Sequence, residues 1–187
     1  MASALESSLR AAVETIERLG YRYALIGGIA LAQWGVVRAT YDVDLKVLAP
    51  GGDYAAARKT LRAAFPHAAR QAIGRNPFIV AVSIGDVIVD FLLALPGYDE
   101  LIIERAVRRD LNGWSAWICS AEDLIIQKAV AGREKDWLDV EALLIEQRAR
   151  LDRAYVSDWL AQFAEALEKP DLVDRYNALV ARSTPTH

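Results

Sequence analysis

The sequence predicts an α/β (α+β) fold, in which a short mixed sheet flanked by helices is followed by a C-terminal helical bundle. Charged and apolar residues alternate strictly at residues 42–47, which is typical of a half-buried strand. Apolar runs at 78–84 and 87–93 meet at a Gly-Asp pair and indicate a hairpin. From residue 120 the pattern is helical, so we expect a core at residues 1–119 and a helical region at 120–187.

The individual elements follow from the spacing of apolar residues and from capping and turn residues. A Ser-x-x-Glu pattern begins the first helix, and Asn112-Gly113 favours a second hairpin. Pro170 separates the last two helices. The expected elements are a helix at 4–19, a strand at 23–26, a short helix at 29–34, the strand at 42–47, a helix from 54 to about 65, strands at 78–84, 87–93, 106–111 and 114–118, and helices at 121–131, 134–148, 152–168 and 171–182.

Composition and charge exclude several classes of protein. The chain has 187 residues, of which 53% are hydrophobic and 25% charged, as in an ordinary globular protein. Cys119 is the only cysteine, so an intrachain disulfide is excluded and a cytoplasmic location is expected. Charged residues interrupt the apolar positions of the first helix, so we expect no signal peptide and no membrane partner. A net charge of -3 disfavours a protein that holds duplex DNA.

Three aspartates form the strongest group of candidate functional residues. Asp42 and Asp44 lie two apart on a strand and therefore point to one side of it, while Asp90 interrupts an otherwise apolar strand. Two like charges about 4 Å apart repel by roughly 4 kcal/mol at an effective dielectric near 20, so clustered carboxylates favour bound cations or raised pKa values. Hard oxygen ligands select Mg²⁺ or Mn²⁺, and His67 and His187 lack the spacing of zinc ligands.

A glycine pair precedes these aspartates. Gly27-Gly28 ends the strand at 23–26 and enters the next helix, an arrangement that brings backbone N–H groups close to a phosphate. A Gly-Gly pair alone is more typical of a tight turn without a ligand. The Asp-x-Asp pattern downstream favours the phosphate interpretation.

Two motifs resemble a known family. The first, Gly27-Gly28-Ile29-Ala30 through Trp34-Gly35, Arg38, Thr40 and Asp42-Val43-Asp44-Leu45, is similar to the signature of the DNA polymerase beta-type nucleotidyltransferase superfamily. The second, Glu122-Asp123-Leu124-Ile125-Ile126-Gln127-Lys128 through Gly132-Arg133, Asp136 and Asp139, is similar to small bacterial enzymes related to abortive-infection toxins. The resemblance covers about residues 20–145 and implies the nucleotidyltransferase fold.

The resemblance also implies a reaction and a set of roles. The enzyme would use Mg²⁺ or Mn²⁺ to transfer an NMP from an NTP substrate to a hydroxyl. Asp42, Asp44 and Asp90 would be the catalytic, metal-binding carboxylates. Nucleotide-binding roles would fall to Gly27, Gly28, Lys128, Asp136 and Asp139. Many relatives have Ser where this chain has Gly28, so one phosphate-binding hydroxyl is missing at that position.

Several of these residues have alternative interpretations. Lys128 is on the inward stripe of its helix and would need an anion there, but a lysine can also extend along the helix edge. Asp136 and Asp139 are equally typical of a solvated face or of charges near a helix N-terminus. Arg38 and Thr40 would reach the phosphates or the acceptor, or Arg38 would pair with Asp42 or an acidic neighbour. Arg70 and Arg75 are weaker candidates for nucleotide contact, and the five tryptophans are expected mostly in the core, with Trp34 a candidate for the nucleotide site.

The acceptor stays open at this point. A toxin-type enzyme would modify tRNA or a protein hydroxyl and would have an antitoxin protein as a partner, whereas an antibiotic-type enzyme would modify a small molecule. A third interpretation is a non-catalytic nucleotide-binding protein with the same fold. Residues 120–187 contain 9 Lys and Arg against 13 Asp and Glu, which favours a basic partner or a small acceptor over RNA in that region.

Overall fold

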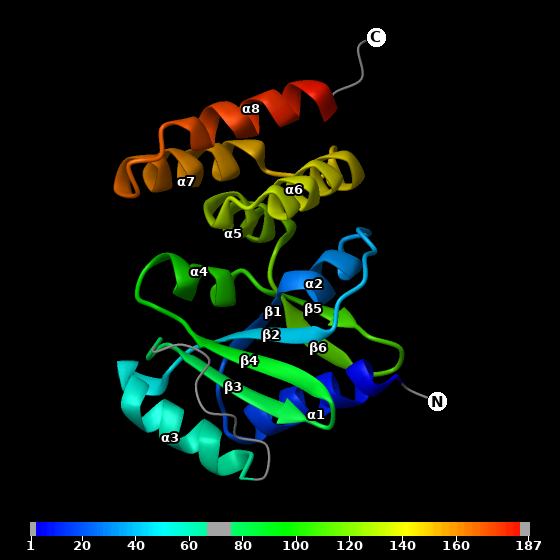
Figure 1. Ribbon diagram of the computed structural model, residues 1–187, viewed down its shortest axis with the longest axis vertical. Coiled ribbons are helices and arrows are strands. Elements are labelled where there is room, and N and C mark those ends of the chain that lie inside the picture. Colours follow the sequence, from blue (N-terminus) through cyan, green and yellow to red (C-terminus); the bar gives the residue numbers. More distant parts are fainter. Residues whose placement is uncertain (1–2, 67–75, 184–187) are drawn as a thin grey trace. The chain divides into compact units, whose positions relative to one another are not determined.

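The computed structural model describes residues 3–66 and 76–183 (Figure 1). Arg70 and Arg75, together with both histidines, lie outside the described residues. The chain divides into two compact units. We call Met1–Ile29 with Ala39–Cys119 the sheet unit, and Ala30–Arg38 with Ser120–His187 the helical unit.

The sheet unit contains one mixed sheet, to which six strands contribute in the described part of the chain. Its strand order is β3-β4-β2-β1-β6-β5. The pairs β2–β4 and β1–β6 are parallel and the other neighbours are antiparallel, so the predicted mixed sheet is confirmed. The strands are β1 (Tyr23–Ile26), β2 (Asp42–Val47), β3 (Ile79–Ile84), β4 (Val87–Leu93), β5 (Val107–Asp110) and β6 (Ser115–Ile118).

Both predicted hairpins are present. β3 and β4 pair through Ile84 and Val87 around the Gly85-Asp86 turn. β5 and β6 are joined by Asn112-Gly113, and both turn residues have positive φ values of 58° and 93°. Asn and Gly adopt this conformation more readily than other residues, which is why the pair favours the turn.

Helices cover both faces of the sheet (Figure 1). The helix α1 (Ala4–Arg18) packs against β2, β3 and β4, and its inward residues Leu9, Val13 and Ile16 are buried. On the opposite side, α4 (Tyr98–Glu104) packs against β1 and β2. The remaining helical elements of this region are α2 (Gly27–Gln33), the 3-10 helix η1 (Pro50–Gly52) and α3 (Tyr54–Ala64).

The helix α4 is absent from the sequence prediction. It is short, and apolar residues precede it without a helical period, so periodicity gives no signal there. Hydrogen bonds to two side chains stabilise the start of the helix. The Glu100 carboxylate accepts from the Gly97 N–H at 3.1 Å, and the Asp99 carboxylate accepts from the Leu95 N–H at 3.0 Å.

The helical unit contains the four predicted C-terminal helices. The Ser120 hydroxyl caps the first of them by accepting from the Asp123 N–H at 3.0 Å, and Gly132 ends it in the left-handed conformation. This helix packs against the other three. The bounds are α5 (Ala121–Ala131), α6 (Glu134–Gln147), α7 (Arg153–Ala166) and α8 (Asp171–Ser183).

Two further observations concern membrane-spanning helices and the burial of the tryptophans. Among the described residues, no helix combines the length and the apolar character that crossing a bilayer requires. The expectation that the tryptophans lie mostly in the core is wrong: all five are described, and of these only Trp137 is buried, whereas Trp117 is 40% exposed. Helical or strand spacing alone does not show whether a large ring faces the core or the rim of a surface hollow.

Candidate active site

The three aspartates lie on two neighbouring parallel strands. Asp44 on β2 is directly opposite Asp90 on β4, and Asp42 is two residues before Asp44 on the same face. The alternate residues of β2, Val43, Leu45 and Val47, are fully buried on the other face. Burial of this apolar face fixes the register of the strand, and the register in turn presents the carboxylates together.

The surroundings of Asp90 disfavour its ionised form. Burial raises its pKa, and the negative charge of Asp42 raises it further. Asp42 itself accepts a hydrogen bond from the Thr40 hydroxyl at 2.9 Å. A nearby cation would lower the free energy of the ionised form of Asp90, since it offsets both burial and repulsion.

The donor chemistry at this face suits Mg²⁺ or Mn²⁺, because carboxylate oxygens are the ligands these cations prefer. Within residues 3–66 and 76–183, no three Asp, Glu, His or Cys side chains are already gathered into a metal-binding group. Asp42 accepts a hydrogen bond from Thr40, and its charge already raises the pKa of Asp90 on the neighbouring strand. The residues therefore fit the ions in type and in strand register.

Gly27 makes room for Asp44. Its φ is +68°, and a Cβ atom at this position would lie 2.1 Å from Oδ2 of Asp44. No side chain can be accommodated at that distance without displacing the carboxylate. Position 27 therefore requires glycine for the placement of Asp44, independently of any contact with a phosphate.

Gly28 makes room for Thr40 in the same way. A Cβ atom at position 28 would lie 2.5 Å from the Thr40 hydroxyl oxygen and 2.7 Å from the Thr40 Cβ. The Thr40 hydroxyl thus stands where a side chain at position 28 would stand. A hydroxyl from a residue twelve positions later in the chain therefore lies beside the Gly28 backbone.

The other predicted site residues meet in the helical unit. Nζ of Lys128 on α5 lies 3.1 Å from Oδ1 of Asp136 and 2.9 Å from Oδ2 of Asp139, both on α6. Arg133 donates to Asp136 from Nη2 at 3.2 Å, and Nε of Arg38 lies 3.1 Å from Oδ1 of Asp139. We call these five residues the buried charge cluster.

Burial decides between the interpretations of these residues. Asp136 is fully buried and Asp139 is 5% exposed, so the solvated helix face expected as an alternative is wrong. Burial raises the pKa of Asp136, but the bonds from Arg133 and Lys128 outweigh it and hold the pKa below its usual range. Lys128 is buried as well and has the anionic partners that an inward lysine needs. A nucleotide-binding role for the cluster stays a prediction.

Sequence reasoning missed one ion pair beside the aspartates. Lys46 follows Asp44 on the same face of β2, is 8% exposed, and is ion-paired with Asp99 of α4. Asp99 also begins α4 through its bond to Leu95. Because no sequence pattern indicated α4, Asp99 could not be identified as the partner of Lys46.

Comparisons with known proteins show the family and the fold of the chain. The family model described as "Nucleotidyl transferase of unknown function (DUF2204)" matches residues 6–175. No curated protein sequence matches the chain significantly.

Similar solved structures share the fold at low sequence identity. An antigenic nucleotidyltransferase-like protein from Paracoccidioides brasiliensis is 19% identical with a TM-score of 0.57, over 95% of each chain. The antibiotic-resistance factor ANT(2'')-Ia is 15% identical with a TM-score of 0.60, over 88% of this chain and 94% of that one. The lincosamide antibiotic adenylyltransferase LnuA is 12% identical with a TM-score of 0.56, over 76% and 98%. With the family model spanning most of its length, the chain belongs to the nucleotidyl transferase family of unknown function.

Proposed function

We propose that the chain is a Mg²⁺- or Mn²⁺-dependent enzyme that transfers an NMP from an NTP to an acceptor hydroxyl. Membership of the nucleotidyl transferase family supports the reaction class. The observation that carries the proposal is the register of β2 and β4, which sets Asp44 opposite Asp90 with Asp42 on the same face. Three carboxylates at this density are unfavourable without a cationic ligand.

The candidate site residues of the sheet unit have separate roles in the proposed reaction. Divalent cations held by Asp42, Asp44 and Asp90 would neutralise phosphate charge and lower the pKa of the acceptor hydroxyl. The backbone N–H groups of Gly27 and Gly28 would bind phosphate oxygens, and the Thr40 hydroxyl beside them would donate to a phosphate oxygen in place of its bond to Asp42. The acceptor oxygen forms a bond to the α-phosphorus, the bond from that phosphorus to the bridging oxygen breaks, and pyrophosphate leaves.

The buried charge cluster supplies predicted nucleotide contacts in the helical unit. Lys128, Arg38 and Arg133 carry three positive charges against the two carboxylates of Asp136 and Asp139, a formal excess of one. This excess favours a phosphate group as a ligand. Asp136 and Asp139 would then hold Lys128 and Arg38 in place for it.

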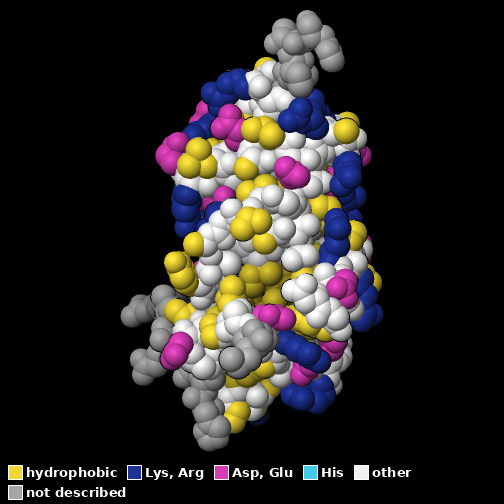
Figure 2. All heavy atoms as spheres, turned by 90° about the vertical axis from the view of Figure 1, so that its right-hand side faces the viewer, with side chains coloured by type: hydrophobic (Ala, Val, Ile, Leu, Met, Phe, Trp, Pro, Cys, Tyr) yellow, Lys and Arg dark blue, Asp and Glu magenta, His cyan; other side chains and the backbone are white. Residues whose placement is uncertain are grey.

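The acceptor is proposed to be a hydroxyl of tRNA or of a protein, in a toxin-like reaction with an antitoxin partner. A small-molecule acceptor is the second candidate, because ANT(2'')-Ia and LnuA, which share the fold, are antibiotic-modifying proteins. On the face shown in Figure 2, Lys and Arg side chains are interspersed with Asp and Glu side chains among the described residues. Such a surface favours contact with one end of an acceptor, because mixed charges do not attract a long stretch of nucleic-acid backbone.

The test uses each α-labelled NTP with Mg²⁺ and, in separate reactions, total cell RNA, cell protein and a panel of hydroxylated antibiotics. We expect one acceptor class to become labelled by the wild-type chain, and no labelling by the Asp42→Asn, Asp44→Asn double variant. Equal labelling by the double variant would overturn the proposal. Mg²⁺-dependent NTP binding with no labelling of any class would indicate a non-catalytic nucleotide-binding protein instead.

A further inference from the structure

A hollow at the far end of the sheet unit has no role in the proposed reaction. It has a volume of about 310 Å³, and its walls include Glu17, Tyr21, Arg22, Tyr23, Glu104 and Trp117. The walls come from the last turn of α1, the segment after it, the start of β1, the end of α4, and β6. We call it the α1–α4 pocket.

The pocket is remote from the three aspartates. Tyr23 is opposite Val47 in the sheet, whereas Ile26, three residues later on β1, is opposite Asp44. At about 3.3 Å per residue, three residues along a strand span roughly 10 Å. Neither the three aspartates nor the glycine pair lines the pocket, so its walls are distinct from the residues proposed to hold the NTP.

Trp117 gives the pocket an exposed aromatic surface. Its ring is 40% exposed, although indole rings usually bury most of their area. Arg108 is directly opposite on β5, with its guanidinium carbon 6.0 Å from the centroid of the ring and its Nε bonded to the Ser115 hydroxyl at 2.7 Å. The ring is thus held at the rim of the hollow, where a planar ligand can stack on it.

Glu17 and Glu104 give the pocket two carboxylates. The buried Tyr23 hydroxyl donates to Oε1 of Glu17 at 3.0 Å and accepts from the Trp117 backbone N–H at 3.3 Å, so it links the carboxylate to the strand that carries the indole ring. Burial raises the pKa of Tyr23 far above its usual value, and the hydroxyl therefore stays a donor at all physiological pH values. A carboxylate accepts about four hydrogen bonds, so Glu17 retains capacity for a ligand N–H.

We infer that the α1–α4 pocket binds a purine base that carries an exocyclic amino group. The base stacks on Trp117, and its amino N–H groups donate to Glu17 or Glu104. The volume of about 310 Å³ is at the small end of the range of ligand pockets, roughly 300–1,000 Å³, and suits one base with part of its ribose. Arg22, also at the wall, would contact a phosphate attached to that base. The inference does not depend on the proposed transfer reaction.

The test compares guanosine and adenosine with inosine, which lacks the amino group of both. Each nucleoside is titrated into the full chain in the presence of EDTA, and the five ¹⁵N-labelled indole signals are followed by NMR. We expect one indole signal, which Trp117→Phe removes, to shift with guanosine and adenosine. Trp117→Ala should weaken binding about tenfold or more, because stacking on an aromatic ring is lost.

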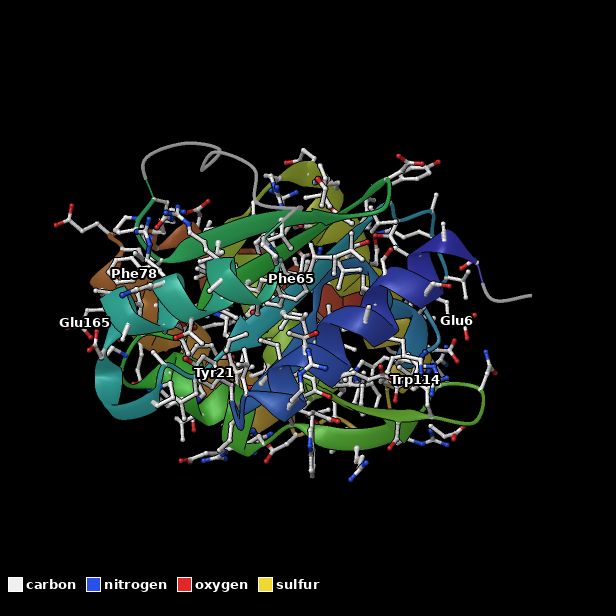
Figure 3. All side chains as sticks on the ribbon, turned by 90° about the horizontal axis from the view of Figure 1, so that it is seen from below. Glu6, Tyr21, Phe65, Phe78, Trp114 and Glu165 are labelled. Carbon is white, nitrogen blue, oxygen red and sulfur yellow. The ribbon has the colours of Figure 1, made fainter. Side chains whose placement is uncertain are left out.

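Matched variants separate the parts of the inference. Trp114 is the control for the ring: it belongs to the same hairpin, has Arg10 6.0 Å from its ring centroid, and lies toward the opposite end of α1 from Tyr21 (Figure 3). Trp114→Ala should bind both nucleosides as the wild type does. Glu17→Gln and Glu104→Gln retain side-chain size, and at least one of them should remove the preference over inosine. Asp42→Asn, Asp44→Asn should leave nucleoside binding unchanged even if the proposed transfer reaction is wrong.

Three results would overturn the inference: no indole shift at millimolar nucleoside, equal loss in Trp117→Ala and Trp114→Ala, or inosine binding as tight as that of guanosine and adenosine. If Trp117→Ala fails to fold, Trp117→Phe still reports whether the shifting signal belongs to position 117. The base could belong to a free nucleotide or to an acceptor RNA. Tighter binding of a short purine-containing oligoribonucleotide than of the mononucleotide, through Trp117, identifies RNA, and equal binding identifies the free nucleotide.

Discussion

The candidate site aspartates lie in two groups, and the surroundings of the two groups shift aspartate pKa values in opposite directions. In the sheet unit, burial and then the charge of Asp42 raise the pKa of Asp90. In the helical unit, burial also acts on Asp136, but Arg133 and Lys128 outweigh it and lower its pKa. One group accumulates like charge, and the other is neutralised by ion pairs within its own unit.

From this difference we expect a cationic ligand at the aspartates of the sheet unit. Like charges on neighbouring strands lower the stability of the fold, so they are retained where binding or catalysis requires them. The buried charge cluster, in contrast, should stabilise the chain without any ligand. Substitutions of single aspartates should therefore reduce activity in one unit and stability in the other.

The largest expected effect is on transfer in Asp90→Asn. Loss of one charge from a pre-organised site should lower transfer about 10²- to 10³-fold, equivalent to about 2.7–4 kcal/mol. Because the pKa of Asp90 is raised in the folded chain, its ionisation destabilises the fold as pH rises through that value. At neutral pH without metal, the variant should be as stable as the wild type or more so, as measured by chemical denaturation.

The control for Asp90→Asn is Asp86→Asn, in the exposed turn of the same hairpin. It should leave both transfer and stability unchanged. Near-normal transfer by Asp90→Asn would show that the third carboxylate is structural and that the proposed role of Asp90 in holding a catalytic cation is wrong.

The next effect is the loss of stability in Asp136→Asn. Removal of one partner from a buried ion pair typically costs about 3–5 kcal/mol, and the lower end is expected here because Asp139 still pairs with Lys128. The pKa of Asp136 is lowered in the folded chain, so its contribution is present above the unfolded pKa and is lost as pH falls through the folded one. Urea denaturation at neutral and acid pH should show the difference from the wild type shrinking in acid.

Glu134 provides the matched control on the same helix. Its side chain is 84% exposed and pairs with Arg175 at 2.8 Å, so solvent screens the pair and Glu134→Gln should cost far less stability than Asp136→Asn. Equal costs for Glu134→Gln and Asp136→Asn would contradict the distinction between an exposed pair and the buried charge cluster.

Ligand binding should stabilise the sheet unit through its aspartates. At 100 times its dissociation constant, Mg²⁺-NTP adds about 2.7 kcal/mol to the free energy of unfolding. A thermal melt of the wild type should shift upward accordingly, and the Asp42→Asn, Asp44→Asn variant should show no shift. The same upward shift in the double variant would place the nucleotide elsewhere in the chain.

Lys128→Ala tests whether the buried charge cluster also binds the triphosphate. A hydrogen bond to a charged group contributes about 1.5–3 kcal/mol, so the dissociation constant for NTP should rise about ten- to a hundredfold. Because this variant also removes a partner of two buried carboxylates, its melting temperature must be measured alongside. The exposed Lys135 on the same helix as Asp136 gives the control, and Lys135→Ala should bind NTP normally. An unchanged dissociation constant for Lys128→Ala would leave the lysine with a structural role alone.

The elements that depend on neighbouring residues could be predicted from the sequence, whereas contacts between residues distant in the sequence could not. Strand alternation at 42–47 and the Asn112-Gly113 turn depend on neighbouring residues, and both were correctly predicted. The approach of Thr40 to Gly28 and the pairing of Lys46 with Asp99 join residues that only the tertiary fold brings together. Burial of Asp136 was likewise invisible, because its partners are on another helix and in the preceding loop.

The smallest expected effect concerns Gly27, whose missing side chain leaves room for Asp44. In Gly27→Ala, the left-handed backbone at φ +68° costs about 1–2 kcal/mol, and the new Cβ atom displaces Oδ2 of Asp44. Gly51→Ala is the matched control, since Gly51 has a φ of +62° and no heavy atom within 4 Å of the added Cβ. Both variants should lose stability through the backbone, as measured by denaturation, but only Gly27→Ala should lose transfer beyond that loss, because a displaced Asp44 no longer faces Asp90. Equal transfer by the two variants would show that the position of Asp44 tolerates the shift, and that the glycine serves the turn alone.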